Sequence, residues 1–178
     1  MLRILIIIMF FCLSVKADQY DQRLENLFSQ LLITENETKI KTIKLKIWDI
    51  WHETNDPKIN ADFFRGIGLM HNGNLKESIK FFSKVIEKNP NFAEAWNKRA
   101  TVFYMLGEYD KSMTDINTTL KLEPRHFGAM DGMILIFLQK GKVDQAVKIY
   151  DEIIKIFPKS KSTLKAKKEL LNYNSNSA

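Results

Sequence analysis

The strongest constraint on this chain is an internal period of 34 residues. Two residue types keep it over three cycles: Pro90, Pro124 and Pro158, and Gly73, Gly107 and Gly141. Glycine suits a turn with positive φ between two helices. Proline ends a helix because it lacks an N–H and restricts the residue before it. The period therefore predicts stacked helical hairpins, each with a glycine in its internal turn and a proline after its second helix.

The period divides the chain into repeats at 59–92, 93–126 and 127–160. The middle repeat shows the pattern most clearly, with Trp96, Ala100, Phe103, Gly107, Tyr109, Ser112, Ile116 and Pro124 at fixed offsets. These residues closely resemble the tetratricopeptide repeat, and the resemblance covers 59–160. It implies an all-α fold, a right-handed superhelix of three helical hairpins. It also implies a non-enzymatic protein that binds other proteins.

Several side chains within the repeats have expected packing roles. Trp96 is expected to fill the gap towards the neighbouring helix. Arg65 and Arg99 stand at a usually aliphatic site, where the stem packs and the head reaches solvent or a carboxylate. One offset must be small because two helix backbones approach closely there, and it is occupied by Ser78, Ser112 and Ala146.

The segments beside the repeats are also predicted to be helical. Residues 18–56 read as a hairpin, a degenerate repeat that covers the first repeat, since terminal repeats are atypical. Its second helix begins at a capping box of Thr34 and Glu37. Trp48 lies off the inward stripe of that helix, so we expect it to be exposed. Residues 161–172 are expected to form a capping helix, and 173–178 a disordered tail.

Residues 1–17 have the layout of a signal peptide. Arg3 precedes an apolar run from Ile4 to Val15, and small residues flank Lys16, which predicts cleavage after Ala17. This predicts export, with a bacterial periplasm favoured. The run is shorter than the roughly 20 residues of a membrane-spanning helix, so a membrane anchor is the second interpretation. Cleavage would remove Cys12, the only cysteine, and with it any disulfide or thiolate metal site.

In tetratricopeptide arrays the first helix of each hairpin lines a concave groove. The resemblance implies that residues two, five, nine, twelve and thirteen of each repeat face it. The first repeat contributes Asn60, Phe63, Ile67, Met70 and His71; the second Glu94, Asn97, Thr101, Tyr104 and Met105; the third Gly128, Asp131, Leu135, Leu138 and Gln139. This largely apolar surface predicts an extended or helical partner segment. Burial of the stripe by the terminal segments remains the alternative.

Some tetratricopeptide proteins grip a C-terminal carboxylate with basic groove residues. The corresponding sites here include Phe63, Ile67, Gly128 and Gly132, and only Lys98 keeps a cation. That kind of clamp is therefore disfavoured.

No motif for chemistry is evident in the sequence. The spacing of His52, His71 and His126 matches no metal site, and each is expected at the surface or in a turn. Nucleophile elbows and phosphate-cradling loops are also lacking. We therefore expect no catalytic residue, metal, cofactor or small-molecule substrate. The lysines at 39–46 and in the C-terminal helix read as solvated faces, which disfavours nucleic acid and leaves open a weak contact with anionic membranes.

The sequence as a whole predicts an exported adaptor that binds a protein or peptide in its groove. The alternative is a structural subunit of an envelope complex, or a homo-oligomer, that uses its convex face or the hairpin carrying Trp48 and Trp51. The identity of the partner and the oligomeric state stay open.

Overall fold

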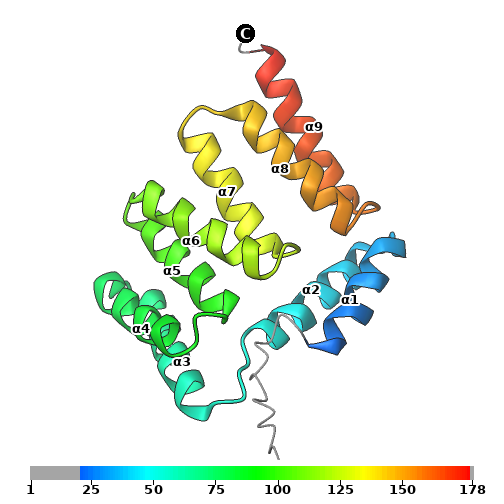
Figure 1. The fold of residues 1–178 in the computed structure, drawn as a ribbon. Helices are drawn as coiled ribbons and strands as arrows, with labels where there is room; N and C mark the ends of the chain where they lie inside the picture. The colour runs from blue at the N-terminus through cyan, green and yellow to red at the C-terminus, as the bar shows by residue number, and fades with distance from the viewer. Residues whose placement is uncertain (1–20, 177–178) are drawn as a thin grey trace, which may run out of the picture.

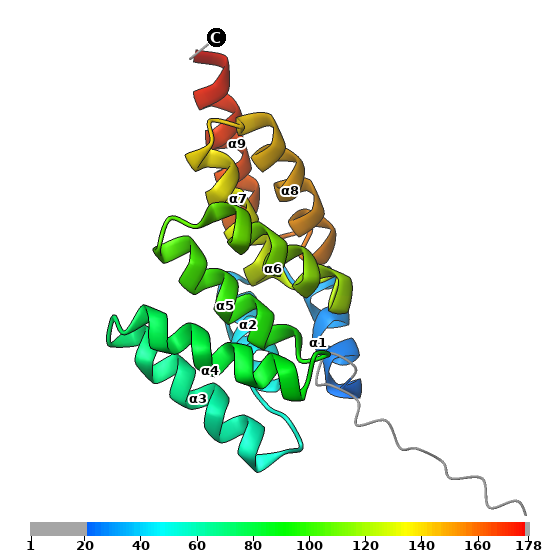
Figure 2. The same cartoon turned by 60° about the vertical axis from the view of Figure 1, so that its left-hand side comes forward.

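The computed structural model describes residues 21–176, and the regular structure of this part is entirely helical (Figure 1). Its helices are α1 (Gln22–Ile33), α2 (Glu37–Trp51), α3 (Pro57–His71), α4 (Leu75–Lys88), α5 (Ala93–Met105), α6 (Tyr109–Leu122), α7 (Phe127–Gln139), α8 (Val143–Ile156) and α9 (Lys161–Asn176). Helices α3 to α8 form three hairpins stacked in sequence order (Figure 2). The predicted all-α fold of stacked hairpins is confirmed. The predicted signal peptide lies outside the described residues.

The repeated glycines lie in the turn inside each hairpin. Gly73, Gly107 and Gly141 have φ values of 75°, 74° and 67°, a region that strains other residues. Each therefore lets the chain reverse directly after the first helix. The small residues of the second helices are buried where the paired helices meet. There the Ser78 and Ser112 hydroxyls donate to backbone carbonyls of the first helix, at 2.9 and 2.8 Å.

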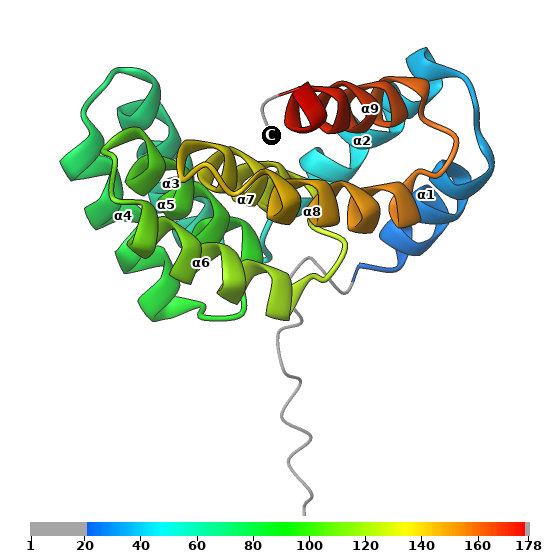
Figure 3. The same ribbon diagram turned by 90° about the horizontal axis from the view of Figure 1, so that it is seen from above.

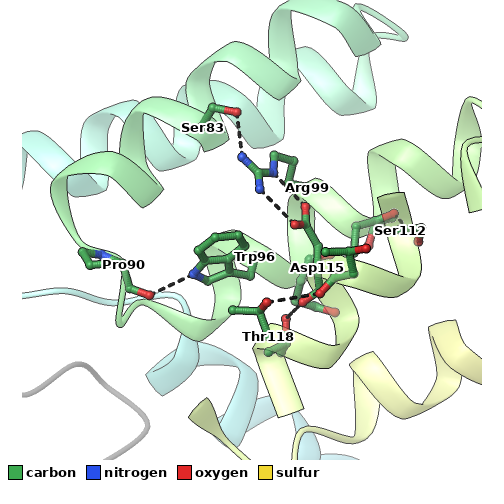
Figure 4. A network of polar contacts seen from close by, with 12 residues as sticks. Ser83, Pro90, Trp96, Arg99, Ser112, Asp115 and Thr118 are labelled. Carbon is green, nitrogen blue, oxygen red and sulfur yellow. Dashed lines mark hydrogen bonds and ion pairs between the residues drawn. The ribbon is translucent and has the colours of Figure 1, made fainter. Parts of the chain in front are cut away.

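An ion pair joins three successive helices of the stack. The guanidinium of Arg99 on α5 donates to both carboxylate oxygens of buried Asp115 on α6, at 2.7 and 2.9 Å (Figure 4). It also donates to Ser83 Oγ on α4, at 2.9 Å. Its guanidinium carbon lies over the Trp96 ring, 4.9 Å from the centroid, and the Trp96 indole nitrogen donates to the Pro90 carbonyl at 2.9 Å. The head of Arg99 thus reaches a carboxylate, whereas Arg65 is exposed.

The N-terminal hairpin packs against the third repeat instead of covering the first. Buried side chains of α1 and α2, among them Leu31, Ile43 and Ile47, share one apolar cluster with Phe127 of α7 and Ile153 of α8. Figure 1 shows α1 and α2 beside the lower ends of α8 and α9. The prediction that this hairpin covers the first repeat was wrong, because its apolar stripe packs against the third repeat, which is far away in the sequence.

The predicted capping box at Thr34 is not formed. Asn36 caps α2, accepting from the Lys39 N–H at 3.0 Å. The carboxylate of Glu37 instead accepts from the backbone N–H of Lys161 at 2.6 Å and from Ser162 Oγ at 2.8 Å, at the start of α9. Figure 3 shows the connection between α8 and α9 beside the connection between α1 and α2. Glu37 therefore ties the start of α2 to the last helix.

The C-terminal helix extends further than expected. Residues 173–176, assigned to a disordered tail, belong to α9, which ends at Asn176. Its contact with the array is narrow: Leu170 packs against the shared cluster, while Leu164 and Leu171 remain exposed.

Trp48 is packed, contrary to the expectation that it is exposed. Its six-membered ring lies over Gly128 at the start of α7, where an added Cβ would be 2.5 Å from Cη2. The ring also makes edge contacts with Phe127 and His126, with centroids 5.5 and 5.4 Å apart. The missing side chain of Gly128 therefore makes the seat for Trp48.

Gly128→Ala should dislodge this indole. The added methyl overlaps a rigid ring, so we expect a loss of about 1–3 kcal/mol in unfolding free energy. Tryptophan emission should shift to the red, and the N-terminal hairpin should be cleaved faster in limited proteolysis.

Gly68→Ala is the matched control for this substitution. Gly68 is also helical, and an added Cβ there meets no atom within 4 Å. Its replacement should stabilise the protein by roughly 0.5–1 kcal/mol through helix propensity. Equal unfolding free energies and equal tryptophan emission in the two variants would contradict the packing of Trp48 over Gly128.

Candidate functional site

The candidate site is the groove, the inner surface formed by the first helices α3, α5 and α7. The C-terminal turn of α2 crosses one part of it. Trp48 lies over Gly128, residue two of the third repeat. The His52 ring lies 5.8 Å from that of Phe63, residue five of the first repeat. His52 Nε2 is also 3.2 Å from a carboxylate oxygen of Glu94, residue two of the second repeat.

A buried carboxylate holds this contact together. Glu94 is 1% exposed and lies among four polar side chains from three segments of the chain. Lys98 Nζ is 2.9 Å from its Oε1. Its Oε2 accepts from His126 Nε2 at 2.8 Å and from Asn97 Nδ2 at 3.0 Å. Every partner is a donor or a potential cation, so the negative charge is well compensated in a site that excludes water.

His126 is the most enclosed member of this cluster. It is completely buried, and its ring stacks on that of Trp51 with centroids 4.1 Å apart and an angle of 10°. Its Nδ1 accepts from the backbone N–H of Ala129 at 3.1 Å and so caps α7. Since Nδ1 is an acceptor, Nε2 carries the hydrogen that is donated to Glu94. One neutral imidazole thus joins a helix N-terminus to a buried carboxylate.

The ionisation of Glu94 results from opposing effects. Burial disfavours the charged form, but the charge of Lys98 and the hydrogen bonds from His126 and His52 outweigh it. They hold the pKa of Glu94 well below its ordinary range. The carboxylate is therefore ionised at neutral pH, and folding gains from its charge.

The rest of the groove remains open between α5 and α7. A hollow of about 170 Å³ lies there, walled by Thr101, Tyr104, Asp131 and Leu135. Its lining also includes Ala100 and Ile116, and an added Cβ at Gly132 would lie 3.3 Å from Ile116 Cδ1. This is smaller than the roughly 300 Å³ at the lower end of small-molecule sites. The hollow has room for one side chain of a larger partner.

Asp131 is the one acidic residue lining the hollow. Its side chain is exposed, and no hydrogen bond or ion pair to it is found within residues 21–176. The surrounding protein partly desolvates the carboxylate and raises its pKa, while the charge of Lys44 acts in the opposite direction. Asp131 in turn helps to raise the pKa of Tyr150, after burial.

The structure divides the predicted groove residues into two groups. Phe63, Met70 and Asn97 are buried, and the amide of Asn60 closes the preceding loop through Thr54. Ile67 is half-buried among the side chains of the first two repeats. The accessible residues are His71, Thr101, Tyr104, Met105, Asp131, Leu135 and Leu138.

The cluster around Glu94 was not expected from the sequence. The sequence predicts each histidine at the surface or in a turn; His126 does lie in the turn before α7, but it is buried there, and His52 is half-buried. One signal was available for His126. It holds the last position of its repeat, one period after Phe92 and one before Ser160, and all three are buried. His52 and Trp48 lie outside the repeats, where no such register applies.

Two features are absent from the described part of the chain. Within residues 21–176, no group of three or more His, Cys, Asp or Glu side chains is placed to hold a metal ion. Over the same residues, no helix has the length and apolar character that crossing a membrane requires.

The fold and groove define a helical repeat protein, and sequence comparison names its family. Tetratricopeptide repeat models match residues 81–114 and 129–160. A TPR repeat-containing protein of Rhizobium etli is 34% identical over 137 residues, which cover 77% of this chain and 67% of the relative. The chain therefore belongs to the tetratricopeptide repeat family, whose repeats are generally non-catalytic binding modules.

Other relatives match over a smaller part of their length. The small glutamine-rich tetratricopeptide repeat-containing protein 2 of Mycosarcoma maydis is 28% identical over 103 residues, or 56% of this chain and 29% of the relative. Human DnaJ homolog subfamily C member 3 is 24% identical over 131 residues, or 71% of this chain and 26% of the relative.

Solved structures show the same fold at low sequence identity. The first TPR of Spaghetti, bound to an HSP90 peptide, has a TM-score of 0.60 and 16% identity, covering 66% of this chain and 94% of its own. The TPR2B domain of yeast Sti1, in an Hsp70 complex, has a TM-score of 0.60 and 14% identity, covering 69% of this chain and all of its own.

The ionised state of Glu94 makes stability depend on pH. Glu94→Gln should lower the unfolding free energy at pH 7 by about 3 kcal/mol, because the buried donors lose their charged partner. The folded pKa lies below the unfolded value of roughly 4.3, so this contribution is complete above the unfolded pKa. It decreases as the pH falls towards the folded pKa. The difference between the two proteins should therefore narrow between about pH 5 and pH 3.

Urea unfolding at several pH values measures that difference. Glu87→Gln serves as the matched control, since Glu87 is exposed on α4. Its effect should be small at every pH. A Glu94→Gln penalty that stays constant down to pH 3 would contradict the assigned charge.

Proposed function

We propose that this protein binds a segment of a partner protein in the open part of its groove, without catalysing a reaction. The observation that carries the proposal is a row of exposed apolar side chains on the inner helices. Met105, Leu135 and Leu138 are 51%, 47% and 38% exposed, and Leu135 lines the same hollow as Tyr104. Exposed apolar side chains gathered at a concave surface mark a site for a partner.

The covered part of the groove limits where such a segment lies. Because α2 occupies the beginning of α5 and α7, the partner contacts the later turns of these helices. A short segment is enough to fill that space. The binding surface is formed in the free protein, which lowers the ordering cost of association.

A carboxylate clamp does not fit this groove. Lys98, the cation that remains among the clamp positions, is 2.9 Å from Glu94 and lies over the Trp48 ring. Its charge is already used within the protein. We therefore expect recognition through apolar contacts and the side chains of the open hollow, not through the terminal carboxylate of the partner.

The alternative of a structural subunit is less supported. Trp51 is buried and Trp48 is partly buried against α7, so the two indoles offer little surface for assembly. The hairpin does expose Leu32, Ile33 and Leu45. Substitutions at these side chains would test the alternative that the protein is a structural subunit.

Photo-crosslinking from Leu138 tests the groove. A benzophenone amino acid at this position on α7 should give a discrete adduct with a partner in the native host. Leu135→Gln in the same protein should weaken that adduct, because it removes an adjacent apolar contact. Crosslinking from Lys121, exposed on α6, is the matched control. Identical adducts from both positions, or none from Leu138, would reject the groove.

We propose further that the protein is exported to a bacterial periplasm. The support is the leader layout of residues 1–17, a charged start, an apolar run and small residues before Asp18. Expression in the host with a C-terminal tag should yield a mature chain that begins at Asp18, detected by N-terminal sequencing. A chain that retains Met1 in a soluble cell fraction would refute the proposal.

A further inference from the structure

The hollow between α5 and α7 is mainly apolar, but four of the residues that line it carry side-chain oxygen atoms that can accept hydrogen bonds. They are Asp131, Thr101, Tyr104 and Asn97. The Asn97 amide nitrogen donates to Glu94, which leaves its oxygen as the group available for another donor. None of the residues lining the hollow is Lys, Arg or His. The hollow is therefore complementary to a donor with positive charge.

The shape of the hollow fits a long side chain. Ala100, Ile116 and the two glycines make an apolar base, while Leu135 and Tyr104 form parts of the wall. A Lys or Arg side chain has an apolar stem and a charged head that donates hydrogen bonds. Its stem matches the apolar wall and its head matches the carboxylate.

The charged groups around Asp131 leave it available to such a head. Lys44 comes from α2, but its ammonium lies over the Phe127 and Phe157 rings, at 4.7 and 5.1 Å from their centroids. His126 donates to Glu94 and accepts from Ala129, so both of its ring nitrogens are engaged within the protein.

From this arrangement we infer that the partner is a segment that inserts one Lys or Arg side chain into the hollow beside Asp131, with apolar residues on either side. The flanking residues contact Met105 on one side and Leu138 on the other. This inference rests on the proposed function and specifies its ligand, a cationic and apolar peptide.

A random peptide library displayed on phage is the probe. Selection on the full chain should enrich peptides that contain one Lys or Arg next to apolar residues. Synthetic copies should bind Asp131→Asn about tenfold more weakly, the effect of losing one charge-assisted contact. Glu87→Gln should bind them as the unaltered protein does. Circular dichroism of Asp131→Asn should be unchanged, because this side chain is exposed and holds no other element in place.

A double-mutant cycle tests whether the peptide cation and the Asp131 carboxylate contact each other directly. Replacing the peptide arginine by citrulline, or its lysine by norleucine, removes the charge and nearly preserves the size. This change should weaken binding to the unaltered protein about tenfold and hardly affect binding to Asp131→Asn, since the partner charge is already absent. Equal losses in both proteins would overturn the inference.

The same experiment separates this inference from the proposed function. Groove-binding peptides are those whose affinity falls with Leu135→Gln. If they are enriched without a cation, or with Asp and Glu, the cationic ligand is wrong while the groove stands. If no enriched peptide responds to Leu135→Gln, the groove itself is wrong and the cationic ligand falls with it.

Discussion

The contact of α2 with the groove, centred on Glu94, is the interaction that gives this protein its particular form. A buried carboxylate is costly unless donors surround it, and here they come from α2, α5 and the start of α7. Because the charge is satisfied only when all of these segments are in place, the contact selects one arrangement of the hairpin on the array. Trp48 and Trp51 add the apolar area that a polar cluster lacks.

The repeats were predictable from the sequence because their contacts are local. Each hairpin needs a reversal after its first helix and a small residue at the closest approach, and Gly107 and Ser112 supply both within a few residues. The partner of the N-terminal hairpin was not predictable in this way. Its contacts join Trp48 to Gly128 and Glu37 to Lys161, and a helical glycine shows by itself no sign that an indole will occupy its space.

The candidate site was predictable only in part, for a related reason. Transferring groove positions from the repeat pattern identified Thr101, Tyr104, Asp131 and Leu135, which together wall the hollow. The same transfer also placed Phe63 and Met70 in the groove, yet both are buried. The repeat pattern assumes that the inner face of each repeat is open. It therefore cannot predict that α2, which lies outside the repeats, covers part of that face.

The position of α2 also bears on specificity. An uncovered inner surface would offer an incoming segment the beginnings of α5 and α7, where Glu94 supplies a second carboxylate. With α2 in place, Glu94 is 1% exposed and its charge is matched by Lys98. The open surface then presents Asp131 as the acidic residue of its hollow, among apolar side chains. When a bound segment covers the hollow, it displaces water from Asp131, and a matching charge then interacts with the carboxylate more strongly than it would in open solvent. The hairpin thus narrows a general peptide groove to a site with one electrostatic requirement.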